Sequence, residues 1–323
     1  MKTTEKHNLI CQTLAVVGVG LLGGSIAAAV KRLGLAQRVL GVGRNAQRLK
    51  QAQELGLLDD FSTELAEAGR EAELVVVCTP VDKIVAHVKA VACGAAERSN
   101  SLTTGSSPEN LSENRSWPDT NAEAIGVLIT DVGSVKTDIC RPLQGQLPSG
   151  AVFVGSHPLA GSEKSGFEYA QAELFSGAVC CVTPTEETPK PAVQRVCEFW
   201  RRLGMCVELL SPEEHDRVVA RTSHLPHVVA AAVARLVTER DGRFAATGFA
   251  STTRVASGDP ELWRPILLGN AEAVAAELER LIVGLNDFRE ALTNKDVDTL
   301  VRLLAEGKQQ REQVVQQQRR NTK

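Results

Sequence analysis

Aromatic side chains are scarce in this chain of 323 residues, where Phe, Trp and Tyr together make up 4% of the sequence. So few aromatic rings argue against the base-stacking surfaces that single-stranded nucleic acids require. The net charge is only −3, so the chain also lacks the excess of positive charge that attracts nucleic acid or an anionic membrane. The composition therefore predicts neither a nucleic-acid partner nor a membrane partner.

Long apolar runs are also missing from the sequence. No stretch reaches the roughly 20 residues of a membrane-spanning helix, and the N-terminal MKTTEKHNLICQ lacks the apolar core of a signal peptide. We therefore expect a cytoplasmic protein. A hydrophobic content of 43% and a charged content of 23% are typical of a soluble globular protein, and the length allows two domains.

Paired cysteines of the CxxC type do not occur. The eight cysteines, at positions 11, 78, 93, 140, 180, 181, 197 and 206, lie mostly within apolar runs. This distribution favours buried thiols over disulfide bonds or a zinc site. The sequence predicts no metal.

The first half of the chain alternates short apolar runs with helical patterns. Because the runs are continuously apolar, they are typical of a parallel sheet covered on both faces. We expect strands at 14–19, 39–42, 74–78, 127–130, 152–154, 179–182 and 206–210, with helices at 23–33, 46–55, 81–93, 136–143 and 191–203. This order predicts an α/β Rossmann-type fold, a doubly wound and mostly parallel sheet.

Two segments depart from this alternation. Residues 98–124 are polar and have almost nothing to bury, so we expect an exposed insert, with a functional lid as the alternative. After the capping box of Ser211 and Glu214, only helical periodicity remains, at 220–238, 261–268, 271–290 and 296–318. We therefore expect an α/β domain at residues 1–210 and an all-helical domain at 211–323.

A glycine-rich turn follows the first expected strand. The sequence VGVGLLGGS places Gly18, Gly20 and Gly23 in a GxGxxG pattern between a strand and a helix. Glycines permit a tight turn, and the backbone N–H groups at the helix start, around Leu21 and Leu22, can approach a pyrophosphate. The turn therefore predicts a bound dinucleotide, NAD or NADP.

The end of the second strand bears on which dinucleotide binds. NAD enzymes usually carry Asp or Glu there for the ribose hydroxyls, whereas this chain has Gly-Val-Gly-Arg-Asn at 41–45. The guanidinium of Arg44 can pair bidentately with a 2′-phosphate. Arg44 therefore favours NADP, although it could instead stack on the adenine or face water.

Later strands deliver further residues to the carboxyl edge of the sheet, where open α/β sheets bind ligands. Thr79, Pro80 and Val81 follow the strand at 74–78 and are expected to line the cofactor groove. Ser134 follows the strand at 127–130 and either contacts a bound ligand or caps the next helix.

His157 lies in GSHPLAGSEKSG at 155–166, a segment that we expect to form a loop after a short strand. At this edge a histidine can accept the proton of a substrate hydroxyl as hydride departs, because its unperturbed pKa of ~6.5 suits a base near neutrality. A histidine satisfied by backbone groups in a turn is the alternative. Glu163 and Lys164 follow on the same loop and are expected to contact a polar substrate.

The helical half contains two further motifs. In TSHLPH, Ser223 and His227 are expected on one helical face, with His224 before a break at Pro226. Neither HExxH nor a carboxylate ligand accompanies these histidines, which argues against a metal. Arg254 follows small polar residues and is accessible to a carboxylate, with a surface ion pair as the alternative.

Together these motifs resemble the prephenate/arogenate dehydrogenase family of tyrosine biosynthesis. The resemblance spans residues 14–303 and rests on VGVGLLGGS, CTPV, DVGSVK, GSHPLAGSEKSG, TSHLPH and GFASTTRVASGDPELW, in that order. It implies the NAD(P)-dependent oxidative decarboxylation of prephenate to 4-hydroxyphenylpyruvate. The alternatives are arogenate as substrate, which gives tyrosine directly, and a dual-substrate cyclohexadienyl dehydrogenase.

The resemblance also implies roles for single residues. His157 would hydrogen-bond the ring hydroxyl of the substrate and accept its proton, assisted by Ser134. Arg254 would bind a substrate carboxylate, and His227 would contact the side-chain end of the substrate. The residues expected to shape the pocket are Ser223, His224 and Glu163. The family further implies a homodimer formed through the helical domain.

One departure from the family pattern is Ser251, which stands three residues before the site arginine where members often have an acid. A gating ion pair through that acid is therefore not expected. Two other functions remain open. A β-hydroxyacid-type dehydrogenase would rely on a catalytic lysine in the helical domain, and a catalytically inactive dinucleotide sensor would bind the cofactor only.

Overall fold

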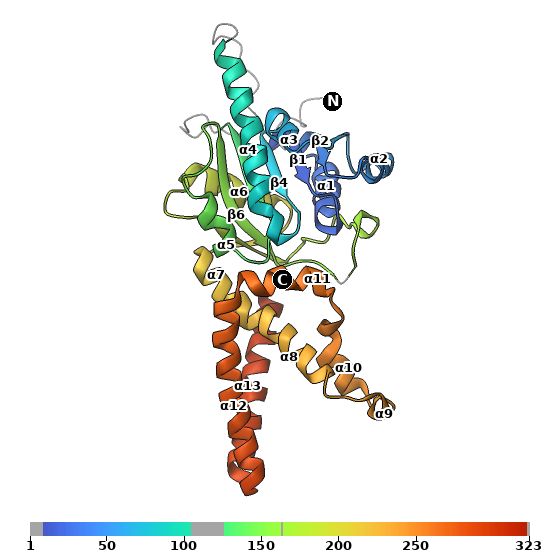
Figure 1. The fold of residues 1–323 in the computed structure, drawn as a ribbon, viewed down its shortest axis with the longest axis vertical. Coiled ribbons are helices and arrows are strands. Elements are labelled where there is room, and N and C mark those ends of the chain that lie inside the picture. The colour runs from blue at the N-terminus through green and yellow to red at the C-terminus, as the bar shows by residue number, and fades with distance from the viewer. Residues whose placement is uncertain (1–8, 105–125, 163, 322–323) are drawn as a thin grey trace. The chain divides into compact units, whose positions relative to one another are not determined.

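The computed structural model describes residues 9–104, 126–162 and 164–321. The chain divides into two compact units, residues 1–215 and 216–323. The first unit combines a sheet with covering helices and the second is helical (Figure 1). No helix in the described ranges is long and apolar enough to cross a membrane.

The described residues of the first unit form one sheet of eight strands, in the order β3-β2-β1-β4-β5-β6-β7-β8. Neighbouring strands are parallel except for β6 and β7, which are antiparallel. The strand bounds are β1 Cys11–Val17, β2 Ala36–Val42, β3 Asp60–Ser62, β4 Leu74–Val77, β5 Val127–Asp131, β6 Ala151–Pro158, β7 Val179–Thr183 and β8 Cys206–Leu209. The predicted doubly wound, mostly parallel fold is confirmed, and its strand order reverses between β1 and β4.

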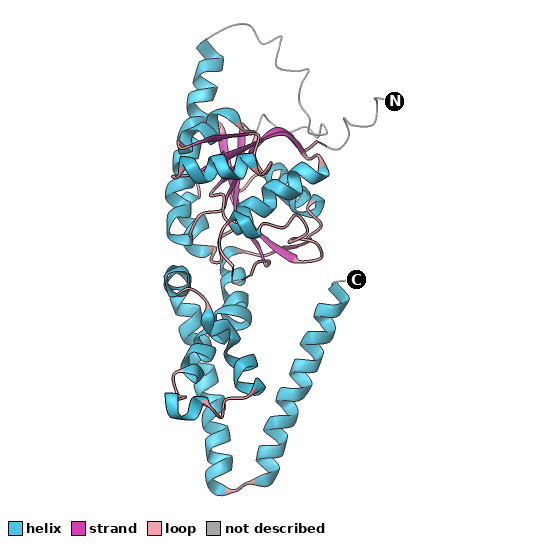
Figure 2. Cartoon of the chain, turned by 90° about the vertical axis from the view of Figure 1, so that its right-hand side faces the viewer, coloured by secondary structure: helices cyan, strands magenta, loops and turns pink. Residues whose placement is uncertain are grey.

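Helices cover the sheet (Figure 2). They are α1 Leu21–Leu33, α2 Ala46–Glu54, α3 Leu65–Glu71, α4 Val81–Thr104, α5 Thr137–Cys140 and α6 Lys190–Arg202, with 3₁₀ turns at Arg141–Leu143 and Phe167–Tyr169. Residues of β4 are buried without exception, and apolar side chains of α1 and α6 pack in the same core. This burial on both faces explains why the strands are continuously apolar rather than alternating.

Two short elements of the first unit, β3 and α3, were not predicted from the sequence. Strand β3 has only three residues and none of them is fully buried, so it carries no apolar run. Helix α3 buries only Ala68 and Gly69, which gives it no stripe of large apolar residues. Apolar periodicity therefore could not reveal either element.

Helix α4 is longer than the predicted 81–93, because it continues to Thr104. Arg98 donates from Nη1 to the carbonyl oxygen of Ala72 at 3.2 Å, and the Ser99 hydroxyl donates to the carbonyl oxygen of Ala95 at 3.1 Å. The first part of the predicted insert, residues 98–104, is therefore helix rather than loop. The rest of it, residues 105–124, lies outside the described residues.

Strand β6 also differs from its prediction, because it includes His157 and Pro158 instead of ending at residue 154. Its first half pairs parallel with β5, and Gly155–Pro158 pairs antiparallel with β7. A Cβ on Gly155 would lie 2.5 Å from Thr183 Oγ1, so glycine is required for this close approach. The expectation of a loop at residues 155–158 was wrong, because partners on neighbouring strands satisfy these polar residues.

The second unit is built from helices joined by short turns. Their bounds are α7 Pro212–Val219, which begins in the first unit, α8 Leu225–Ala234, α9 Glu239–Gly242, α10 Thr247–Thr253, α11 Pro260–Gly269, α12 Ala271–Asn294 and α13 Val297–Asn321. The predicted capping box at the start of α7 is confirmed. Ser211 N donates to the Glu214 carboxylate at 3.0 Å, and Glu214 N donates to Ser211 Oγ at 3.2 Å.

Helices α3 and α4 approach each other through glycines. A Cβ on Gly94 would lie 1.9 Å from the carbonyl oxygen of Ala66, and one on Gly69 would lie 2.0 Å from that of Val91. Because both obstacles are backbone atoms, a methyl group at either position forces the helices apart.

We expect Gly94→Ala to lower the free energy of unfolding by about 1–3 kcal/mol, the range for overpacked cores. Gly307→Ala on α13 is the matched control, since none of the described residues has an atom within 4 Å of the added methyl group, and alanine favours a helix by about 1 kcal/mol. Urea denaturation followed by circular dichroism measures both changes. A Gly94→Ala protein as stable as the wild type would contradict the close approach.

Candidate functional site

In the glycine-rich turn between β1 and α1, each of the three glycines has a different environment. Gly18 has a φ of +95°, and a Cβ there would lie 2.8 Å from Thr79 Cγ2. A Cβ on Gly23 would lie 2.2 Å from the Gly18 carbonyl oxygen. At Gly20, by contrast, no atom of the described residues lies within 4 Å of an added Cβ, so this backbone is open to a ligand at the start of α1. Leu21 and Leu22 are the first residues of that helix.

A cavity of about 560 Å³ opens beside Gly20. Its lining residues are Val19, Gly20, Arg48, Ser165, Gly166, Glu168 and Tyr169. Arg48 Nη2 donates to both carboxylate oxygens of Glu168, at 2.8 and 3.0 Å, and the guanidinium lies 4.6 Å from the centre of the Phe167 ring. The cavity is thus lined by the open backbone at Gly20 and by the guanidinium of Arg48, and both groups can bind the phosphates of a dinucleotide. Arg48 and Glu168 could not be paired from the sequence, because 120 residues separate them.

Arg44 lies at an exposed bend between β2 and α2, and Asn45 caps α2 by accepting from Arg48 N at 3.1 Å. Thr79 and Pro80 follow β4, and Val81 begins α4. Thr79 Oγ1 lies 2.9 Å from His87 Nδ1. Burial lowers the pKa of His87, and the positive charges of Arg44 and Lys83 lower it further. His87 is therefore neutral at pH 7, and Arg44 and Lys83 supply positive potential beside it.

The loop after β5 is anchored by a buried ion pair between Asp131 and Lys136, neither of which has exposed surface. The Asp131 carboxylate also accepts from the backbone N–H of Gly133 at 2.8 Å and of Ser156 at 3.0 Å. Lys136 Nζ donates in addition to the Ser156 carbonyl oxygen at 2.8 Å. Ser134 is half-buried within this loop, so the same contacts that tie the loop to β6 fix its backbone.

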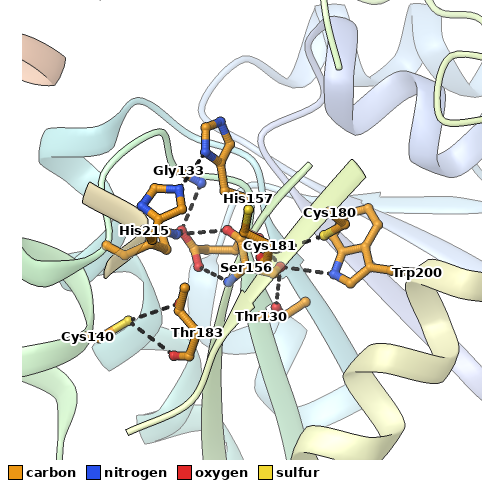
Figure 3. A network of polar contacts seen from close by, with 12 residues as sticks. Thr130, Gly133, Cys140, Ser156, His157, Cys180, Cys181, Thr183, Trp200 and His215 are labelled. Carbon is orange, nitrogen blue, oxygen red and sulfur yellow. Dashed lines mark hydrogen bonds and ion pairs between the residues drawn. The ribbon is translucent and has the colours of Figure 1, made fainter. Parts of the chain in front are cut away.

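The hydroxyl of Ser156 is the centre of a second set of contacts (Figure 3). It donates to the Asp131 carbonyl oxygen at 2.5 Å and accepts from Trp200 Nε1 at 3.0 Å. Thr130 Oγ1 lies 2.7 Å away and must be a donor, because the single hydrogen of Ser156 is already used. Strands β5 and β6 and helix α6 are thus joined at one buried atom, directly before His157.

His157 is half-buried on β6, with Cys181 of β7 opposite it. Its Nδ1 lies 2.9 Å from Nε2 of His215, a fully buried residue of α7 (Figure 3). Burial raises the pKa of the Cys181 thiol to about 11, so this thiol is protonated at pH 7 and does not act as a nucleophile. His215 was missed in the sequence because 58 residues separate it from His157.

His227, in the second unit, is buried and stacks on Trp263, with ring centroids 3.6 Å apart and planes at 15°. Burial lowers the pKa of His227, so the ring is neutral at pH 7. Its Nδ1 has no hydrogen-bond partner among the described residues. A buried polar atom without a partner is costly, so a ligand that bonds Nδ1 would be stabilised there.

His224 lies against Trp263, as His227 does, with the ring centroids of His224 and Trp263 6.1 Å apart. A π-helical turn at Ala220–His224 separates α7 from α8, and it leaves Ser223 exposed while His224 is buried. Asn270 donates from Nδ2 to the Asp216 carbonyl oxygen at 2.8 Å, and this Nδ2 lies 3.1 Å from His224 Nδ1. The expectation that Ser223 and His227 share a helical face stays a prediction, and Ser223 is the more exposed of the two.

Arg254 is exposed at the start of a 3₁₀ turn, Arg254–Ser257, directly after α10. Ser251 donates within α10 to the Thr247 carbonyl oxygen at 2.8 Å. Glu163 lies outside the described residues. In the described ranges no three His, Cys, Asp or Glu side chains are grouped so that they could hold a metal ion.

Family models match most of the chain. The model described as "Prephenate dehydrogenase, nucleotide-binding domain" matches residues 26–114 and 122–209, and that described as "Prephenate dehydrogenase, dimerization domain" matches residues 211–306. The first match has a gap at residues 115–121, inside the predicted insert.

Individual relatives agree with these matches. A prephenate dehydrogenase of Bacillus subtilis is 31% identical over 94% of this chain and 76% of its own length. A cyclohexadienyl dehydrogenase of Zymomonas mobilis is 32% identical over 92% of this chain and 94% of its own. The crystal structure of a prephenate dehydrogenase from A. aeolicus with hydroxyphenyl propionate and NAD+ has 31% identity and a TM-score of 0.79, over 94% of this chain and 98% of that one.

The glycine-rich turn on a doubly wound sheet fits the family model of a nucleotide-binding domain. The helical second unit lies in the range that the family model of a dimerization domain matches. The chain belongs to the prephenate dehydrogenase family of NAD(P)-dependent oxidoreductases.

Proposed function

We propose that this chain oxidises prephenate with NAD(P) and releases carbon dioxide, giving 4-hydroxyphenylpyruvate. The observation that carries the proposal is the place of His157. Its imidazole lies near the end of β6, next to the anchored loop with Ser134, in a unit whose first strand ends in an open glycine turn. A histidine so placed can act as a base at the ligand-binding edge of the sheet.

His157 has the central role in the proposed chemistry. It accepts the proton of the C4 hydroxyl as that carbon is oxidised, and the hydroxyl of Ser134 hydrogen-bonds the same oxygen. A nicotinamide dinucleotide held at the glycine-rich turn would supply the acceptor for the hydride that leaves C4. The C1 carboxylate then leaves as carbon dioxide, the electron pair of the broken bond makes the ring aromatic, and the ring oxygen takes its proton back from His157. Because aromatisation drives the reaction, the protein mainly has to orient the substrate and supply the base.

The second unit supplies the remaining proposed contacts with the substrate. The exposed guanidinium of Arg254 suits a carboxylate, and the neutral ring of His227 offers an unsatisfied Nδ1 for the side-chain end. Glu163, Ser223 and His224 remain proposals from the family resemblance. Among these, the contact of His224 with Asn270 favours a structural role for His224.

We propose NADP as the preferred dinucleotide. Arg44 is exposed at the end of β2, where NAD enzymes place an acid, and its charge acts together with that of Lys83 on His87. A 2′-phosphate beside these groups would be stabilised by a charge-assisted hydrogen bond. The backbone at Gly20 and the guanidinium of Arg48 would hold the phosphates common to both dinucleotides.

A homodimer through the second unit is also part of the proposal. The matching family model is described as a dimerization domain. Large apolar side chains are exposed on α11, α12 and α13, namely Leu262, Leu268, Ile282, Val283, Leu285, Leu292, Val297, Val301, Leu304 and Val314. A second copy of this chain would cover such surface. A cytoplasmic location stays a prediction.

Initial rates with prephenate or arogenate, each with NAD or NADP, test the proposed function. We expect the highest kcat/KM for prephenate with NADP. A higher kcat/KM for arogenate than for prephenate would make arogenate the preferred substrate and would leave the proposed reaction steps unchanged. Failure to reduce either nucleotide in all four combinations would leave only a dinucleotide-binding role.

His157→Asn tests the base directly. We expect kcat to fall by about 10²–10⁴-fold, the usual contribution of general acid–base catalysis. The dissociation constant for NADP, measured by fluorescence titration, should stay within about twofold of the wild-type value, because NADP binding does not require proton transfer to His157. A variant that keeps near-full turnover would remove His157 from the chemistry.

Arg44→Asp tests the choice of cofactor. We expect NADP binding to weaken by about 10–100-fold relative to NAD, since a charge-assisted hydrogen bond contributes about 1.5–3 kcal/mol. Lys50→Asp on α2 is the control, because it reverses a charge whose side chain is 67% exposed. Calorimetric titration with both nucleotides measures the effect. An unchanged preference would show that Arg44 does not read the 2′-phosphate.

A further inference from the structure

His215 lies in direct contact with His157. The 2.9 Å contact joins Nε2 of His215 to Nδ1 of His157, and the ring centroids are 5.1 Å apart with planes at 66° (Figure 3). His215 has no exposed surface, whereas His157 is half-buried. The capping box of Ser211 and Glu214 holds the first turn of α7, from which His215 projects. A buried imidazole on a capped helix is a fixed partner for a more exposed one.

The contact restricts which nitrogen of His157 carries the proton. Between two neutral imidazoles only one of the two facing nitrogens is protonated. If His215 Nε2 donates, the only hydrogen of His157 is on its Nε2, and that nitrogen cannot accept a proton. If His157 Nδ1 donates, its Nε2 has a free lone pair. Only the second arrangement leaves His157 able to act as a base through Nε2.

On the basis of the proposed function, we infer that His215 is a positioning residue that accepts a hydrogen bond from His157 Nδ1 and thereby keeps His157 Nε2 unprotonated for the substrate hydroxyl. In the step itself, the O–H bond of the substrate breaks and its electron pair forms the carbonyl as hydride leaves. The proton forms an N–H bond at His157 Nε2. His215 takes no proton, but its lone pair stabilises the positive charge on His157.

Two substitutions of similar size separate this role from packing. His215→Gln places a carbonyl oxygen near the position of Nε2 and can still accept from His157. His215→Phe keeps a ring in the same space but has no acceptor. We expect kcat to fall by about 100-fold in His215→Phe and by less than about tenfold in His215→Gln, by analogy with other catalytic histidines whose tautomer is fixed by a buried partner. The dissociation constant for NADP should stay within about twofold in both.

A double-mutant cycle shows whether His215 acts through His157. In the His157→Asn background, we expect His215→Phe to change the residual kcat by less than about twofold, because the group that it positions is gone. An undiminished 100-fold loss in that background would overturn the proposal. So would a single His215→Phe variant with kcat within about twofold of the wild type.

A spectroscopic readout needs no substrate and therefore separates failure of this inference from failure of the proposed function. The chain has six histidines, and ¹⁵N labelling of their rings, with His157→Asn for assignment, reports the tautomer of His157 in the intact protein. We expect a protonated Nδ1 and an unprotonated Nε2 in the wild type and in His215→Gln. A protonated Nε2 in the wild type would overturn the inference even if His215→Phe fails to fold.

Discussion

The buried ion pair between Asp131 and Lys136 is the interaction on which the geometry of the sheet depends where the loop after β5 meets β6. Both side chains are completely buried, and together they bond the backbone of Gly133 and Ser156. Removing one partner of such a pair destabilises a protein by about 3–5 kcal/mol, because the other charge stays buried without compensation. The positions of Ser134 and His157 therefore follow from an electrostatic constraint rather than from apolar packing alone.

Strand β6 shows how polar residues enter a sheet when their partners are fixed. It is parallel to β5 over its first residues and antiparallel to β7 over its last. Ser156 can be buried in the core because its hydroxyl forms hydrogen bonds with Thr130, Asp131 and Trp200. Trp200 in turn belongs to α6, so the helix, the two strands and the residue before His157 form one hydrogen-bonded unit.

The sequence was sufficient to predict the parts of the fold that depend on local patterns. Continuous apolar runs indicated the main strands, and the glycines at 18, 20 and 23 indicated the turn between β1 and α1. Interactions between distant residues were not predictable in the same way. The extension of β6 depends on Asp131, 25 residues earlier, and the contact of α3 with α4 depends on glycines, which carry no apolar signal. His157 was identified by its position after a strand, but its partner His215 could be found only once the chain was folded.

Cys181, opposite His157 on β7, has a consequence for the redox behaviour of the protein. A thiol whose pKa is raised to about 11 stays protonated at pH 7, and the thiolate is the form that oxidants attack. Cys180, Cys140 and Cys11 are buried as well, while Cys93 on α4 is exposed. The thiol opposite His157 is thus a poor target for oxidants, and we expect the exposed Cys93 on α4 to be oxidised before Cys181.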